Sequence, residues 1–130
     1  MKVSSADKYD AEFNEAIKMQ ISALAVTQHP LATTNQNKLA ELAITNRLPA
    51  IYPRTDFVAS GGLMSYGPDQ AEPYRRAAAM VDKILKGTKP AEIPVEQPMR
   101  FEFVVNLKTA KQIGVTIPPN VLVRADRVIK

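Results

Sequence analysis

The sequence contains no cysteine and only one histidine among its 130 residues. Without cysteine the chain can form no disulfide and perform no thiolate chemistry, which is compatible with any compartment. The single histidine, His29, cannot build a histidine-based metal cluster. No apolar run is long enough to span a bilayer. These absences exclude thiol chemistry, histidine-based metal sites and membrane-spanning helices from the functions considered below.

Sequence signatures of catalysis and of nucleotide binding are also missing. Gly61 and Gly62 form a lone pair without the spacing of a phosphate-binding loop, and no nucleophile elbow is present. They are more typical of a turn that needs positive φ. A Ser–His arrangement of Ser65 with His29 is conceivable in space, but no motif supports it. We therefore expect a protein that is not an enzyme and that uses no cofactor and no metal.

The formal charge of +4 and the isoelectric point near 9.4 could suggest a nucleic-acid binder. A binder of that kind concentrates its cations on one face and interleaves aromatic residues. Here only Arg75 and Arg76 are adjacent, and Glu72 and Asp82 lie close to them in the sequence. We interpret the charge as a solvated, mildly basic surface and expect no nucleic-acid partner.

The length fits a single domain, because a second independent core is unusual in a chain this short. We predict one lobe over residues 1–130, with a flexible start over residues 1–9 and a proline-rich arm over residues 89–98. The polar residues that follow Met1 do not resemble a secretory signal peptide.

Apolar residues at helical spacing predict helices over residues 10–20, 33–48, 69–87 and 106–114, and a weakly helical tail from residue 120. Thr33 and Gln36 have the spacing of a capping box, and Asn106 is placed to cap the fourth helix. The apolar stripe of the third helix begins at Tyr74, which we expect to lie in the core. Gly87 is a natural terminator of that helix.

Short apolar segments predict strands over residues 21–27, 50–52, 63–66 and 101–105, with an irregular stretch over residues 54–62. Helices that alternate with short buried strands indicate an α/β fold, here a three-layer sandwich with a mostly parallel sheet. In such sheets a ligand lies beyond the carboxyl ends of the strands.

The strand-end rule selects Thr27, Gln28 and His29 after the first strand, and Ser65 and Tyr66 at the third. The Tyr66 ring can stack on an apolar ligand while its hydroxyl faces water, although plain packing is an equal alternative. His29 offers a donor and an acceptor on one ring. The alternative for His29 is a loop histidine that is exposed or bonded to the backbone.

Eight blocks of the sequence resemble the C-terminal part of one protein family. They are, in order, residues 46–52 (NRLPAIY), 61–68 (GGLMSYGP), 74–78 (YRRAA), 81–87 (VDKILKG), 94–98 (PVEQP), 106–111 (NLKTAK), 117–119 (IPP) and 124–126 (RAD). The order and spacing are similar to those of the substrate-binding proteins of ABC importers that are related to tryptophan- and tyrosine-binding lipoproteins.

The resemblance implies the C-terminal lobe of a type I periplasmic-binding-protein fold, located outside the cytoplasm. Proteins of this type hold a small organic solute in a cleft between two lobes and present it to a membrane permease. The first lobe is largely absent from the sequence, so residues 101–105 would belong with that lobe and lack a partner. A homodimer would cover the apolar surface left open.

The resemblance places Thr27, Gln28, His29, Ser65 and Tyr66 as ligand contacts. The segment from Thr27 to Pro30 departs from the Pro-Thr-Asp-Asn wording of relatives that bind amino acids. We therefore consider an aromatic acid or another small organic solute as an alternative ligand to an amino acid. Two further hypotheses are a self-associating remnant without ligand and, least favoured, a small α/β enzyme that uses His29 and Ser65.

Overall fold

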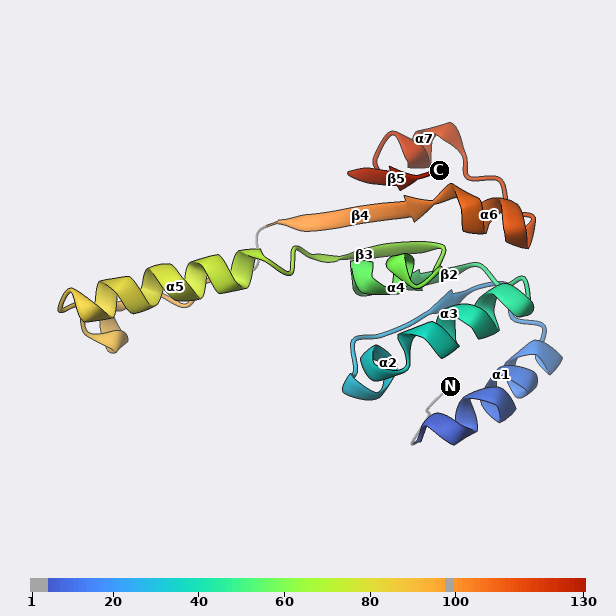
Figure 1. Ribbon diagram of the computed structural model, residues 1–130, viewed down its shortest axis with the longest axis horizontal. Coiled ribbons are helices and arrows are strands. Elements are labelled where there is room, and N and C mark those ends of the chain that lie inside the picture. Colours follow the sequence, from blue (N-terminus) through green and yellow to red (C-terminus); the bar gives the residue numbers. More distant parts are fainter. Residues whose placement is uncertain (1–4, 98–99) are drawn as a thin grey trace. The chain divides into compact units, whose positions relative to one another are not determined.

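The computed structural model describes residues 5–97 and 100–130, which form two compact units (Figure 1). Unit 1 combines Met1–Gly67 with Glu102–Lys130, and unit 2 is the intervening segment Pro68–Phe101. Across the part of the chain that the structure describes, no helix combines the length and apolar content needed to cross a bilayer.

Unit 1 is an α/β structure with a five-stranded sheet in the order β1-β2-β3-β4-β5. The strands are β1 (Leu24–Ala25), β2 (Ala50–Tyr52), β3 (Met64–Pro68), β4 (Phe101–Asn106) and β5 (Arg127–Ile129). The helices that flank the sheet are α1 (Tyr9–Lys18), α2 (Pro30–Thr34), α3 (Gln36–Thr45), α4 (Thr55–Ala59), α6 (Leu107–Ile113) and α7 (Pro119–Leu122), with a 3-10 turn over Ala6–Lys8.

The sheet is parallel except between its third and fourth strands. Ala25 of β1 is in register with Ile51 of β2, and Tyr52 of β2 with Ser65 of β3. β4 and β5 are also parallel to each other. The backbone N–H of Asn106 donates to the carbonyl of Leu63, and that of Asp69 to the carbonyl of Arg100, so β3 and β4 run in opposite directions (Figure 1). The mostly parallel α/β fold expected from the sequence is confirmed.

Two apolar clusters form the core of unit 1. The first gathers α1, α3, β2 and α4 around Phe13, Leu39, Tyr52 and Phe57, whose side chains are almost wholly buried. The Tyr52 and Phe57 rings stack with centroids 4.8 Å apart. The second joins α6 to the sheet around Val105 and Ile113 and the neighbouring side chains of Leu63, Ala110 and Ile117. These clusters fix the strands that carry the candidate site.

The sequence-based helix over residues 33–48 is in fact two helices. α2 begins at Pro30 because the Nδ1 atom of His29 accepts a hydrogen bond from the Leu31 N–H at 3.2 Å, which caps it. Asn35 then departs from helical geometry, with φ −114° and ψ 26°. Thr33 therefore lies inside α2 and the predicted capping box is wrong. A positive φ at Arg47 follows the end of α3.

Three further expectations are corrected by tertiary packing. The stretch over residues 54–62 contains α4, whose Phe57 and Val58 are buried. The tail folds as α7 and β5, because Asn106 and Val105 of β4 supply a strand partner for Ile129 and Val128. β4 pairs with β3 and β5, so it does not lack a partner as the missing first lobe implied.

Unit 2 contains α5 (Glu72–Leu85) and a 3-10 turn over Pro90–Glu92. α5 buries none of its residues, and Tyr74 is 79% exposed. The expectation that Tyr74 lies in the core is therefore wrong, because the described residues provide nothing for its stripe to pack against. Pro98 of the predicted arm lies outside the described residues.

Candidate functional site

The carboxyl ends of β1, β2 and β3 meet at one edge of the sheet, because these three strands are parallel. β4 and β5 run the other way and begin at the same edge. The residues that follow β1, β2 and β3 therefore lie along one edge of the sheet. We call this the carboxyl edge.

β1 contributes Thr27, Gln28 and His29, and all three side chains are exposed. The Val26 N–H donates to the Ile51 carbonyl at 3.0 Å, so pairing with β2 continues up to the residue before Thr27. His29 uses Nδ1 to cap α2, so the proton of the neutral ring sits on Nε2. The carboxyl edge thus offers a hydroxyl, an amide and an imidazole N–H donor.

β3 contributes Tyr66, whose side chain is 56% exposed. Its ring meets the Phe103 ring edge-on at a centroid distance of 6.5 Å. Ser65, the residue before it, is fully buried and its Oγ has no hydrogen-bond partner within the described residues. Successive residues of a strand point to opposite faces. The structure therefore brings the Tyr66 ring to the surface and closes Ser65 into the core.

Gly67 allows β3 to approach β2 closely at this edge. A Cβ atom at residue 67 would come 2.0 Å from the carbonyl oxygen of Pro53, which is far inside contact distance. Only glycine fits such an approach of two backbones. Gly67 thereby sets how closely the chain after β2 lies beside Tyr66.

Arg54 is a residue of the carboxyl edge that the sequence reading missed. It lies two residues after the end of β2 and occupies the N-cap position of α4. Its Nε donates to Oδ2 of Asp56 at 3.2 Å, and the guanidinium also forms an ion pair with that carboxylate. The sequence feature that could have identified this residue is an arginine two positions after a predicted buried strand. Its planar head group suits a carboxylate ligand.

The Ser–His arrangement that the sequence left conceivable is not assembled among the described residues. A nucleophilic serine needs a base within hydrogen-bond reach, and the buried Ser65 hydroxyl has no partner among the described residues. His29 is exposed and already accepts a backbone hydrogen bond through Nδ1. The described residues also contain no group of three acidic or imidazole side chains placed to hold a metal ion.

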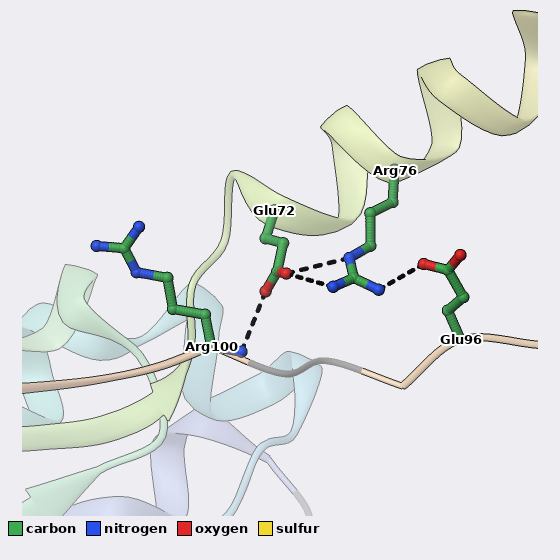
Figure 2. A network of polar contacts seen from close by, with 4 residues as sticks. All are labelled: Glu72, Arg76, Glu96 and Arg100. Atoms are coloured by element: carbon green, nitrogen blue, oxygen red, sulfur yellow. Dashed lines mark hydrogen bonds and ion pairs between the residues drawn. The ribbon is translucent and has the colours of Figure 1, made fainter.

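A pocket of about 160 Å³ lies within unit 2, between α5 and Glu96 and Gln97. Arg76 is one of the charged residues that line this pocket. It donates from Nε and Nη2 to Oε1 of Glu72 at 3.0 and 2.7 Å and pairs with Glu96 through Nη1 (Figure 2). The Arg100 N–H donates to the other Glu72 oxygen at 3.2 Å. The one guanidinium is thus paired with two carboxylates, and the volume is below the ~300 Å³ at which typical ligand pockets begin.

Comparison with known proteins assigns the family. The family model for ABC transporter substrate binding protein matches residues 6–129. Among curated proteins, no match was found.

Three solved structures resemble the chain. A conserved domain protein from Vibrio cholerae O1 biovar El Tor is 23% identical with a TM-score of 0.86, and covers 98% of this chain. An ABC domain from Streptococcus pneumoniae, solved in complex with L-Trp, is 27% identical with a TM-score of 0.85, and covers 99%. A ligand-free, open substrate binding protein with adhesive properties from Clostridium difficile is 20% identical with a TM-score of 0.70, and covers 98%.

The chain spans less than half of each of these proteins: 43% of the first two and 42% of the third. The family match nevertheless extends over nearly all of the 130 residues, and the mostly parallel sheet agrees with the fold of the structural neighbours. The chain therefore belongs to the ABC transporter substrate-binding protein family.

Proposed function

We propose that this chain is the C-terminal lobe of the solute-binding component of an ABC importer, and that it binds a small organic solute without transforming it. The observation that carries the proposal is the carboxyl edge, where exposed hydrogen-bonding groups and an exposed aromatic ring come from separate parallel strands. The family match supports the same role. The site of action is extracytoplasmic, where such a lobe presents its solute to a membrane permease.

The solute class we propose is an amino acid or an aromatic acid. Tyr66 and Phe103 form an aromatic corner against which a flat ring can pack. Arg54, held in place by Asp56, provides a cation for a carboxylate. Thr27, Gln28 and His29 offer groups that can orient the polar end. The S. pneumoniae relative was solved with L-Trp, which makes this amino acid the first probe.

The isolated lobe should bind weakly, because a cleft between two lobes shares its contacts between both. An amide NMR titration of the 130-residue chain with L-Trp measures such weak binding. We expect shifts at Thr27, Gln28, His29, Arg54 and Tyr66. Replacing Tyr66 by alanine should weaken the affinity about two- to tenfold, since an aromatic contact is worth about 0.5–1.5 kcal/mol.

Tyr74→Ala is the matched control, because Tyr74 is an exposed tyrosine of unit 2. Its substitution should leave the affinity for L-Trp unchanged. Benzoate and an aliphatic amino acid, titrated in parallel, separate the contribution of the ring from that of the carboxylate. Shifts confined to unit 2, or none at the carboxyl edge up to about 10 mM of any of the three probes, would contradict the proposal.

A second candidate function is self-association without a ligand. One observation favours it, namely the apolar side chains of α5 that the described residues leave uncovered. The titration separates the two candidates, because a remnant without ligand shows no response at the carboxyl edge.

A further inference from the structure

Asp126 lies beside the aromatic corner that Tyr66 and Phe103 form at the carboxyl edge. It directly precedes β5, and its backbone N–H donates to the Phe103 carbonyl at 2.9 Å. The pair of Phe103 and Asp126 thus continues the parallel register in which Val104 lies opposite Arg127. Because the Tyr66 ring contacts the Phe103 ring, residues of β3, β4 and the start of β5 follow one another along this edge.

The Asp126 carboxylate is held through one of its oxygens and open at the other. Oδ2 accepts the Phe103 N–H at 2.8 Å, so the side chain bonds the same residue that the Asp126 backbone bonds. Oδ1 has no hydrogen-bond partner within residues 5–97 and 100–130, and Asp126 is exposed. A carboxylate accepts through both oxygens, so this one keeps the capacity to bind a ligand in an orientation that the backbone fixes.

The negative charge of Asp126 is not paired with a cation in the part of the chain that the structure describes. Arg124 and Arg127 are the arginines nearest to it in the sequence, and neither forms an ion pair with it. The Arg127 Nε atom instead lies 3.9 Å from Oε1 of Glu102. Asp56, the carboxylate that follows β2, differs because it is already ion-paired. Asp126 can therefore attract a positively charged group.

The aromatic corner favours the same sign of charge. The faces of tyrosine and phenylalanine rings are electron-rich and attract a cation that lies within about 6 Å. A positively charged group beside Phe103 would meet both the ring electrons and the Asp126 carboxylate. A carboxylate in the same place would meet a like charge. The corner and Asp126 thus discriminate between solutes by the sign of the group next to their ring.

We propose that Asp126 is a specificity-determining residue, which receives the ammonium group of a solute whose flat ring packs against the aromatic corner. The inference rests on the proposed function and selects, between its two solute classes, the amino acid over the aromatic acid. Because Asp126 is exposed, water screens the contact, and the ion pair should contribute about two- to fivefold to the affinity.

Three indole compounds that differ only in their charged groups test the assignment on the 130-residue chain. L-Trp carries an ammonium and a carboxylate, tryptamine only the ammonium, and indole-3-propionate only the carboxylate. Amide NMR titrations up to about 10 mM should show tighter binding of L-Trp and tryptamine than of indole-3-propionate. Asp126→Asn should weaken the binding of the two ammonium compounds about two- to fivefold and should not weaken that of indole-3-propionate.

The choice of variants separates the charge of Asp126 from its hydrogen bond. Asparagine keeps a side-chain oxygen that accepts the Phe103 N–H, whereas Asp126→Ala removes this acceptor and should weaken all three compounds alike. Glu15→Gln is the matched control. Glu15 is an exposed carboxylate in the second half of α1, which leads to the start of β1 at the opposite edge of the sheet. Its substitution should change none of the three affinities.

The outcomes distinguish this assignment from the proposed function. Equal losses for all three compounds in Asp126→Asn, or an unchanged affinity for tryptamine, would overturn the role of Asp126 while binding at the carboxyl edge stands. Tighter binding of indole-3-propionate than of tryptamine to the parent chain would overturn it without any variant. If none of the three compounds shifts amides at the carboxyl edge, the proposed function itself is contradicted and the assignment falls with it.

Discussion

Two buried hydroxyl groups in unit 1 lack hydrogen-bond partners within the described residues. Tyr52 is 1% exposed and Ser65 is fully buried, and they are in register on neighbouring strands. Neither Tyr52 Oη nor Ser65 Oγ has an acceptor or donor among the described residues. A buried unsatisfied hydroxyl costs about 1–3 kcal/mol. The Tyr52 ring stabilises the folded chain by stacking on Phe57, whereas the unsatisfied Tyr52 hydroxyl destabilises it.

Tyr52→Phe should therefore raise the free energy of unfolding by about 1 kcal/mol, because it removes the unsatisfied hydroxyl and keeps the ring. Urea unfolding of the two chains measures this difference. Tyr66→Phe is the control, since the exposed Tyr66 hydroxyl carries no such cost. A loss of stability in Tyr52→Phe would show that the hydroxyl has a bonded partner in solution.

The pH dependence of stability follows from the same side chain. Burial raises the pKa of Tyr52 well above the ordinary value of about 10. Because the unfolded chain ionises first, stability from this group is complete below pH ~10 and declines as the pH rises through the folded-state pKa. The decline should be shallower in Tyr52→Phe when urea unfolding is repeated at alkaline pH.

At the scale of elements, α6 is the helix that the sequence described best. It spans Leu107–Ile113 and ends at Gly114, which adopts the left-handed conformation with φ 78°. Asn106 caps it by accepting the Thr109 N–H at 3.1 Å. The Thr109 hydroxyl donates to the Gly61 carbonyl at 2.8 Å, which ties the first turn of α6 to the turn before β3.

Asn106→Ala should lower the free energy of unfolding by about 1 kcal/mol, because the side-chain acceptor at the N-cap is lost. Asn106→Ser keeps an acceptor at the same position and should recover most of the loss. Urea unfolding of the three chains gives the comparison. Equal stability of the alanine and serine variants would mean that the cap contributes little.

Features that depend on local interactions could be predicted well from the sequence, whereas features that depend on tertiary packing could not. The cap and the terminator of α6 act through backbone hydrogen bonds within a few residues, so their residue types sufficed. α4 was missed because five residues are too few to show a helical period, and its burial comes from Phe57 packing on Tyr52. The strand of residues 21–27 is reduced to Leu24–Ala25, because its neighbour β2 is only three residues long.

The location of the carboxyl edge could be predicted from the sequence, because it depends only on where the strands end. A strand-end rule locates Thr27, Gln28 and His29, which are exposed at the end of β1. It does not reveal that Ser65 points into the core while Tyr66 points outward, since this depends on the register with Tyr52. Whether these five residues contact a solute stays a prediction until the titration is done.

At the scale of the whole molecule, the two units differ in how their helices are stabilised. Unit 1 contains both apolar clusters, whereas α5 of unit 2 has no buried residue and is held by the network around Arg76. These ion pairs are partly exposed and partly screened by solvent, so they contribute only modestly to stability. Local opening of α5 should therefore cost less free energy than global unfolding.

Native-state hydrogen exchange of the 130-residue chain should show α5 amides that exchange much faster than those of β4 and α3. Protection of α5 equal to that of β4 would contradict this account.

The antiparallel pairing of β3 with β4 has a consequence for how such a chain evolves. The backbone leaves the sheet after β3 and re-enters it at β4, where Asp69 and Arg100 are hydrogen-bonded to each other. The intervening residues are thus a module inserted into the tip of a β-hairpin. Because both ends of the module meet, it can be lengthened, exchanged or replaced by a tight turn without altering the order of the strands. The sheet and the inserted segment can therefore change independently of each other during evolution.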